Sequence, residues 1–309
     1  MEHQKKTGIQ LAMRVSALSI ISNVLLSVFK LFAGIIAHSG AMISDAVHSL
    51  SDVFSTFIVI IGVKLSGKES DAKHQYGHER IECVAAILLA VMLAITGIGI
   101  GYSGVMKIID DDGAEPLIPG TLALVAAIVS IAVKEAMFWY TRAAAKKINS
   151  GALMADAWHH RSDSLSSVGS FVGILGARLG LPVLDPIASV VICLFIIKAA
   201  YDIFKDAIRK MTDEACDNDV VEQIRSVSLK QEGVLGVDQI QTRLFGNRIY
   251  VDIEICADGT VPLKQSHSIA QQVHDAIEAA FPAVKHCMVH VNPYQTNETA
   301  VQQTENHST

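Results

Sequence analysis

Six stretches of this chain are each long and apolar enough to cross the hydrocarbon core of a bilayer as a helix. A spanning helix needs about 20 mainly apolar residues for about 30 Å of hydrocarbon, and it satisfies its own backbone hydrogen bonds there. Half of the 309 residues are hydrophobic and only 18% are charged. That balance leaves too little polar surface for a soluble protein of this size. The stretches cover residues 12–37, 40–66, 82–109, 117–142, 151–178 and 183–205.

Basic residues indicate which ends of these helices face the cytoplasm. Six crossings put both termini on one side, and lysine and arginine gather before the first stretch and in the second and fourth connections (Lys5, Lys6, Arg14, Lys64, Lys68, Lys73, Arg80, Arg142, Lys146 and Lys147). The other connections hold almost none. The positive-inside rule therefore predicts a multi-pass protein of the cytoplasmic (inner) membrane with both termini in the cytoplasm.

After about Met211 the composition becomes that of a small soluble domain. Apolar spacing predicts helices over 219–231 and 264–280, and strands over 237–243, 249–255 and 285–291. We therefore expect a membrane all-α six-helix transmembrane domain plus a small cytoplasmic α/β domain, an α-β-β-α-β open-faced sandwich. The expected boundaries are 1–11 for a cytoplasmic N-terminus, 12–208 for the transmembrane domain, 209–294 for the cytoplasmic domain and 295–309 for a disordered tail.

The octet Asp-Ala-x-His-x-x-Ser-Asp occurs twice in the apolar stretches, at 45–52 and at 156–163. At 3.6 residues per turn, the His and the final Asp of each octet lie on one helix face. Ionisable groups are costly in hydrocarbon, so several of them in membrane segments indicate an ion pathway. A lone His-Asp pair can simply join two helices through a hydrogen bond. A duplicated pair with its spacing preserved favours a shared ion site.

His48, Asp52, His159 and Asp163 therefore offer two imidazoles and two carboxylates to one ion. This ligand set suits a divalent transition metal, and tetrahedral zinc fits it best. Because a histidine must be neutral to bind a metal, metal and protons compete for the same lone pairs. We expect zinc ions, or another divalent transition metal, to leave the cytoplasm in exchange for protons that enter down their gradient.

The leading carboxylates of the octets, Asp45 and Asp156, have a different expected role. Each lies about 10 Å along its helix from Asp52 or Asp163, too far to share one small ion with it. We expect them to support or gate the site without touching the ion. Helix packing alone is an equally good explanation.

Two other ionisable residues lie close to this pattern. His160 can pair with Asp156 at a four-residue spacing, but the register of the first octet favours His159 as the ligand. Lys134 and Glu135 also lie within an apolar stretch. Interhelical pairing or snorkelling to the interface is the ordinary explanation for such charges.

A second candidate ion site lies between the second and third stretches. Asp71, His74 and His78 follow the pattern Asp-x-x-His-x-x-x-His, which gathers three ligands if the loop begins to wind. Alternatively, this run only shapes a turn and caps the third helix.

Together, these features resemble the cation diffusion facilitator family of metal-ion/proton antiporters, to which the eukaryotic zinc transporters also belong. The resemblance covers nearly the whole chain: six helices, His-x-x-x-Asp on the second and fifth, the histidine-bearing loop and the α/β domain. It implies a bacterial exporter of zinc or another divalent metal, a homodimer in membrane lipid, with the four octet residues as its transport site. Relatives with Asp in place of His48 often accept more metals, so His48 favours zinc.

The resemblance also implies metal-binding and dimerisation functions for residues 209–294, and an interfacial metal site for the loop. Asp252, His267 and His290 fit positions of the family's regulatory cytoplasmic site. Asp238 stands where relatives often have a histidine, and Asn292 where they often have an aspartate. We therefore expect one ion rather than two at this site, with solvated surface residues as the alternative.

Several other functions find little support in the sequence. A net charge of −6 without a basic run gives no reason to expect nucleic-acid binding, and the five scattered cysteines suggest neither disulfides nor a thiolate zinc site. A membrane metalloenzyme would need an open metal position and a base such as His-Glu-x-x-His supplies, and that motif does not occur. A metal sensor would need an output motif. We expect a transporter rather than an enzyme. Export of iron or manganese remains the alternative, although two histidines count against manganese.

Overall fold

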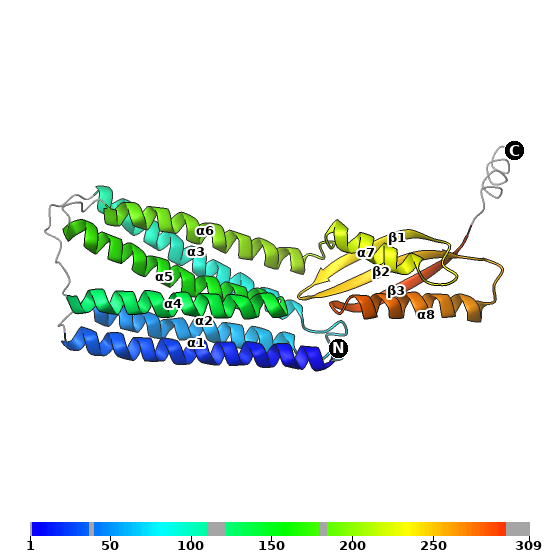
Figure 1. Cartoon of the computed structure of the whole chain (residues 1–309), viewed down its shortest axis with the longest axis horizontal. Helices are drawn as coiled ribbons and strands as arrows, with labels where there is room; N and C mark the ends of the chain where they lie inside the picture. Colours follow the sequence, from blue (N-terminus) through cyan, green and yellow to red (C-terminus); the bar gives the residue numbers. More distant parts are fainter. Residues whose placement is uncertain (1, 37–39, 110–120, 179–183, 295–309) are drawn as a thin grey trace. The chain divides into compact units, whose positions relative to one another are not determined.

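The computed structural model describes residues 2–36, 40–109, 121–178 and 184–294. Contacts divide the chain into two compact units, with the boundary between Ile208 and Arg209. Each unit is described by itself. The first contains six helices that run alongside one another (Figure 1): α1 (Glu2–Ile36), α2 (Gly40–Ser66), α3 (Arg80–Ile109), α4 (Thr121–Ile148), α5 (Gly151–Arg178) and α6 (Leu184–Met211).

Three of these helices are long and apolar enough along the described residues to cross a membrane by themselves: Thr7–Ala33 within α1, Arg80–Met106 within α3 and Pro186–Met211 within α6. The other three, α2, α4 and α5, carry Asp52, Lys134, and His159 with Asp163, all of which are buried. A charged residue is tolerated in a spanning helix when it faces the interior of the bundle. The six-crossing prediction therefore depends on the helices packing together.

The interior of the helix bundle contains buried polar side chains beside an apolar core, and its outer surface carries many exposed apolar side chains. On α1, Ser19, Asn23 and Lys30 are buried, whereas Leu25 is 65% and Phe32 64% exposed. Exposed apolar surface of this extent on a helix suits contact with lipid tails. The buried polar side chains follow helical spacing, so they form one stripe that faces the neighbouring helices.

Glycines let α3 and α6 approach closely. A Cβ added at Gly97 would lie 2.9 Å from Ile196, and one at Gly101 would lie 2.6 Å from the Sγ of Cys193. Small residues at such contacts let two backbones pack at short range, which is how helices associate in lipid. α1 packs mainly against α2, and α4 against α5, while α5 also contacts α2 and α3. These contacts bring α2, α4 and α5 together around the bundle interior.

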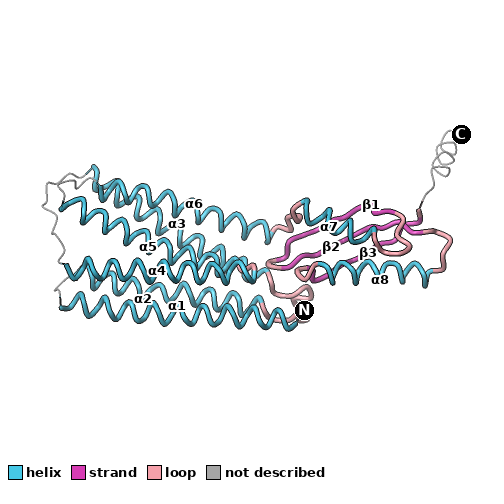
Figure 2. Tube along the Cα trace, in the orientation of Figure 1, coloured by secondary structure: helices cyan, strands magenta, loops and turns pink. Residues whose placement is uncertain are grey.

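The second unit is a three-stranded sheet with two helices (Figure 2). Its elements are α7 (Asn218–Leu229), β1 (Gly236–Phe245), β2 (Arg248–Ala257), α8 (Leu263–Ala280) and β3 (Val284–Pro293). β1 pairs with β2 antiparallel through a tight turn at Gly246, which has a φ of 62° that favours glycine. The α8 connection makes β3 parallel to β2. The sheet order is therefore β1-β2-β3.

Alternation along β2 decides which face of this sheet is covered. Val251, Ile253 and Ile255 are buried and form one core with Ile224 of α7 and Val273 of α8. Since neighbouring side chains on a strand point to opposite faces, Asp252 and Glu254 lie on the face away from the helices. One face of the sheet is covered by helices and the other carries polar residues.

The predicted fold class is confirmed, including the order α-β-β-α-β. Element boundaries shift at the polar ends: α1 already begins at Glu2, and α4 and α6 continue to Ile148 and Met211. Lysine, arginine, glutamine and glutamate are good helix formers, so a helix continues beyond the apolar residues that identify it. The predicted tail, 295–309, lies outside the described residues.

Candidate metal centre

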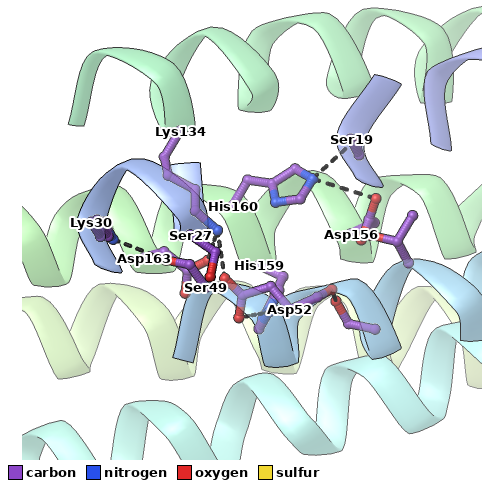
Figure 3. Close-up of polar contacts among 12 residues, drawn as sticks. Ser19, Ser27, Lys30, Ser49, Asp52, Lys134, Asp156, His159, His160 and Asp163 are labelled. Carbon is purple, nitrogen blue, oxygen red and sulfur yellow. Dashed lines mark hydrogen bonds and ion pairs between the residues drawn. The ribbon is translucent and has the colours of Figure 1, made fainter. Parts of the chain in front are cut away.

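Three of the predicted transport ligands meet in the interior of the helix bundle (Figure 3). Asp52 comes from α2, and His159 and Asp163 come from adjacent turns of α5. One possible ligand atom from each lies within 4.8 Å of the others. The Nε2 of His159 is 3.3 Å from the Oδ1 of Asp52. All three side chains are buried, as a shared ion site within a membrane requires.

A lysine completes this cluster. The Nζ of Lys134, on α4, donates hydrogen bonds to the Oδ2 of Asp52 at 2.6 Å and to the Oδ2 of Asp163 at 2.8 Å. Lys134 is 1% exposed, so it forms an interhelical pair and does not snorkel to the surface. Sequence reasoning recognised a charge in an apolar stretch but did not connect it with the octets. Its only signal was the presence of a lysine within a predicted spanning helix.

Among the remaining octet residues, the structure describes the side chains on α5 but not those of the two metal-site candidates on α2. The backbone of α2 places His48 one turn before Asp52, but the side chains of His48 and Asp45 lie outside the described residues. Asp156 is fully buried in a separate polar cluster, where the Oγ1 of Thr56 donates to its Oδ1 at 3.3 Å. His160 joins that cluster through its Nε2, 3.5 Å from the Oδ2 of Asp156.

This second cluster also includes α1, because the Nε2 of His160 lies 3.3 Å from the Oγ of Ser19. Thus the two adjacent histidines point to different partners: His159 to Asp52 and His160 to Asp156 and Ser19. This cluster on α5 therefore contacts α2 through Asp156 and α1 through His160, which is compatible with the support role or the packing role predicted for Asp156.

The loop residues also come together. One possible ligand atom from each of Asp71, His74 and His78 lies within 4.8 Å of the others. The Nδ1 of His74 is 3.2 Å from the Oδ1 of Asp71, and the Nε2 of His78 is 3.4 Å from the Oδ2. His78 is buried in the loop just before α3, while His74 is exposed. This arrangement resembles an accessible three-ligand metal site at the surface.

The loop backbone holds Asp71 in its ionised form. The backbone N–H of His74 donates to its Oδ1 at 2.8 Å and that of Lys73 at 3.0 Å. These hydrogen bonds, with further ones from the side chains of His74 and Lys68, lower the pKa of Asp71 well below its ordinary value. The carboxylate is therefore ready to bind a cation throughout the physiological pH range.

The four predicted ligands of the cytoplasmic domain are not gathered at one point. Asp252 and His290 line the same shallow pocket on the polar sheet face, together with Glu254 and Met288. His267 lies on α8, the helix that covers the opposite face. Within one chain, the described residues therefore bring Asp252 and His290 to one surface and leave His267 on another.

Asp238 is held near the edge of this sheet by neighbouring side chains. The Sγ of Cys256 donates to its Oδ1 at 2.9 Å, and the Nδ2 of Asn292 donates to its Oδ2 at 2.8 Å. These bonds lower the pKa of Asp238, while the carboxylate raises the pKa of the Cys256 thiol to about 11. The two departures noted in the sequence, Asp238 and Asn292, thus bond to each other.

Comparisons with known proteins agree with this architecture. A family model described as the cation efflux transmembrane domain matches residues 16–212, and one described as the cation efflux protein cytoplasmic domain matches residues 216–294. The chain belongs to the cation efflux family. This is the cation diffusion facilitator family that the sequence resembles, and its members are transporters rather than enzymes.

Curated relatives of this cation efflux protein match along nearly its whole length. An uncharacterized transporter of Methanocaldococcus jannaschii is 38% identical and covers 89% of this chain and 96% of that protein. The magnetosome protein MamB of Magnetospira is 32% identical, and the match covers 86% of this chain and 89% of MamB. The manganese efflux system protein MneP of Bacillus subtilis is 28% identical, and the match covers 92% of this chain and 97% of MneP.

Proposed function

We propose that this cation efflux transporter exports zinc from the cytoplasm in exchange for protons, at a site formed by His48, Asp52, His159 and Asp163. The observation that carries the proposal is the meeting of Asp52, His159 and Asp163 within 4.8 Å of one another in the bundle interior. His48 is added because α2 places it one turn from Asp52 and because the two octets share one spacing. The two leading carboxylates, Asp45 and Asp156, support or gate the site.

The ligand chemistry supports zinc as the transported ion. Two imidazoles and two carboxylates supply four ligands of the kind that zinc takes in tetrahedral sites. None of the cysteines is among the residues that form this cluster, so the ion would not be held by thiolates. A transporter must release its cargo, and ligands without thiolates favour release.

Proton exchange follows from the same side chains. A histidine and two carboxylates can bind either a metal ion or protons, and each ion displaces the other. If α2 and α5 tilt against the rest of the bundle, the site is exposed to the two sides in turn. The proton gradient would then drive the metal outward.

Further proposals concern assembly, ancillary sites and location. We place the protein in the inner membrane with both termini in the cytoplasm, because basic residues gather on that side in the sequence. The family model for residues 216–294 is named ZT_dimer, which favours a homodimer.

Asp71, His74 and His78 form an ancillary metal site. Asp252 and His290 provide part of a cytoplasmic one, to which the exposed His267 and Asp238 contribute through the partner chain.

Manganese is the second candidate for the cargo. The name of the relative MneP assigns manganese efflux to that protein, and the match extends over nearly the whole of both chains. Against manganese stand the two histidines, because a site made of oxygen ligands alone suits that ion better. The cargo is therefore to be decided by measuring each metal.

The test is flux through the purified protein in vesicles that carry a pH gradient, with zinc, cadmium, iron and manganese offered one at a time. Asp163→Ala removes a central ligand and should abolish the flux of every metal. The matched control is Asp202→Ala on α6, where a carboxylate bonds to the exposed Lys198 at 3.0 Å, and this variant should transport normally. Full zinc flux in the Asp163→Ala protein would refute the proposed site. Zinc flux that is indifferent to the pH gradient would refute proton exchange.

A further inference from the structure

We propose that Lys134 is a tethered cation that competes with the transported metal for the carboxylates of Asp52 and Asp163. The incoming ion displaces the lysine, and the lysine's return speeds the ion's release. The proposal rests on the function above and adds a component to that site. It assigns to α4 a direct part in a site otherwise built from α2 and α5.

The geometry gives Lys134 the position of a bound cation. Its ammonium bridges the Oδ2 atoms of two carboxylates that come from different helices, at 2.6 Å and 2.8 Å. A lysine that served only to anchor one helix would need one such partner. Figure 3 shows the ammonium directed between Asp52 and Asp163, on the side where His159 also lies. A metal ion bound by Asp52 and Asp163 would compete with the ammonium for these two carboxylates.

Charge explains why the lysine and the metal exclude each other. Two buried carboxylates without a counter-charge are costly within a membrane, and one ammonium offsets part of that charge. A divalent ion on the same oxygens would lie against a fixed positive charge in a medium of low dielectric constant, where like charges repel strongly. Binding of the metal therefore requires the ammonium to move away from at least one carboxylate.

The α4 helix offers an acceptor for the displaced ammonium. Ser130 precedes Lys134 by four residues, so both lie on one face of α4. Long helical side chains lean toward the helix N-terminus, which is the direction of Ser130. The Ser130 side chain is buried, and within the described part of the chain its Oγ makes no hydrogen bond. The hydroxyl can accept a hydrogen bond from the ammonium after displacement.

With Lys134 present, the site binds the metal more weakly and releases it faster. A competitor attached to the protein lowers the affinity for the metal, and its return replaces the metal's contacts as the ion leaves. Removal of the competitor should therefore tighten binding and slow release at the same time. A merely structural lysine would give the opposite result for affinity, because loss of a buried ion pair loosens the helices that carry the ligands.

The experiment measures zinc binding and zinc flux for full-length wild-type protein, Lys134→Met and Lys134→Arg. Each of the three proteins is also titrated with Asp163→Ala added, which removes the intramembrane site. The difference between the two titrations gives zinc binding at that site alone. Lys134→Met should lower the dissociation constant by about tenfold or more, and should lower the maximal flux. Lys134→Arg keeps the charge and can pair with both carboxylates through a planar fork. It should raise the dissociation constant.

Lys30→Met is the matched control, because Lys30 is another buried lysine of the bundle and its Nζ donates to the hydroxyl of Ser49. It should not tighten zinc binding. An affinity unchanged or weakened by Lys134→Met overturns the proposal, and so does equal tightening by Lys30→Met, which would indicate a general effect of charge. If Asp163→Ala alone leaves flux intact, the proposed function fails first. If Asp163→Ala is inactive and Lys134→Met behaves like wild type, only the tethered cation fails.

Discussion

The hydrogen bond between Cys256 and Asp238 predicts how fast this thiol reacts in the cytoplasmic domain. The Sγ of Cys256 lies 2.9 Å from the Oδ1 of Asp238, and the carboxylate would repel a thiolate at that distance. This bond, together with burial, raises the pKa of Cys256 to about 11 from an ordinary value of 9.0. Asp238→Asn keeps the shape of the side chain and removes its charge. It should bring the thiol pKa back toward the ordinary value.

The magnitude follows from two opposing effects. A fall of about 2 in the pKa raises the thiolate fraction at pH 8 by about a hundredfold. The thiolate becomes less nucleophilic as its pKa falls, and this offsets about a tenfold part of the gain. We therefore expect Asp238→Asn to speed alkylation of Cys256 by about tenfold at pH 8.

The assay is timed alkylation of the full-length protein with iodoacetamide, followed by peptide mass spectrometry, so that Cys256 is read separately from the other cysteines. Asp258→Asn is the matched control, because Asp258 is two residues away and its Oδ1 accepts hydrogen bonds from Thr260 instead. An equal rate in wild-type and Asp238→Asn protein would refute the proposed electrostatic cause. So would an equal acceleration by Asp258→Asn.

Three further outcomes follow from the packing and the ligands. Ile277→Ala empties part of a fully buried position in the cytoplasmic core and should destabilise that domain by about 2–5 kcal/mol, seen as faster hydrogen exchange in β2. Gly101→Leu should lower the melting temperature of the detergent-solubilised protein, because its Cβ would meet the Sγ of Cys193 at 2.6 Å, whereas Gly99→Leu, with nothing within 4 Å of its Cβ, should not. His48→Asp should raise manganese flux relative to zinc flux, because oxygen ligands suit manganese better.

The part of the candidate site that periodicity controls was predictable from the sequence. A four-residue spacing puts His159 and Asp163 on one helix face in any α-helix, and the repeated octet points to a partner helix with the same pattern. The preference for His159 over His160 also came from this repeat. In the structure His159 faces Asp52, and His160 faces Asp156. Local rules were sufficient for the pairs His159/Asp163 and His160/Asp156, because both members of each pair lie on α5.

The position of Lys134 was not predictable by the same reasoning. Its partners lie on α2 and α5, and the register between helices depends on packing contacts distant in the sequence. A buried charge in a spanning helix predicts a partner of opposite charge, but the identity of that partner requires the three-dimensional arrangement.

The most direct test of the central claim is the zinc K-edge absorption spectrum of the loaded full-length protein, with the loop site removed by His74→Ala and the cytoplasmic site by His290→Ala. The account predicts one zinc ion surrounded only by nitrogen and oxygen at about 2.0–2.2 Å, with the scattering pattern of imidazole. This bound zinc should be lost when Asp52→Ala is added. Sulfur scattering at about 2.3 Å, or zinc retained in the Asp52→Ala protein, would contradict the claim that these side chains form the cation site.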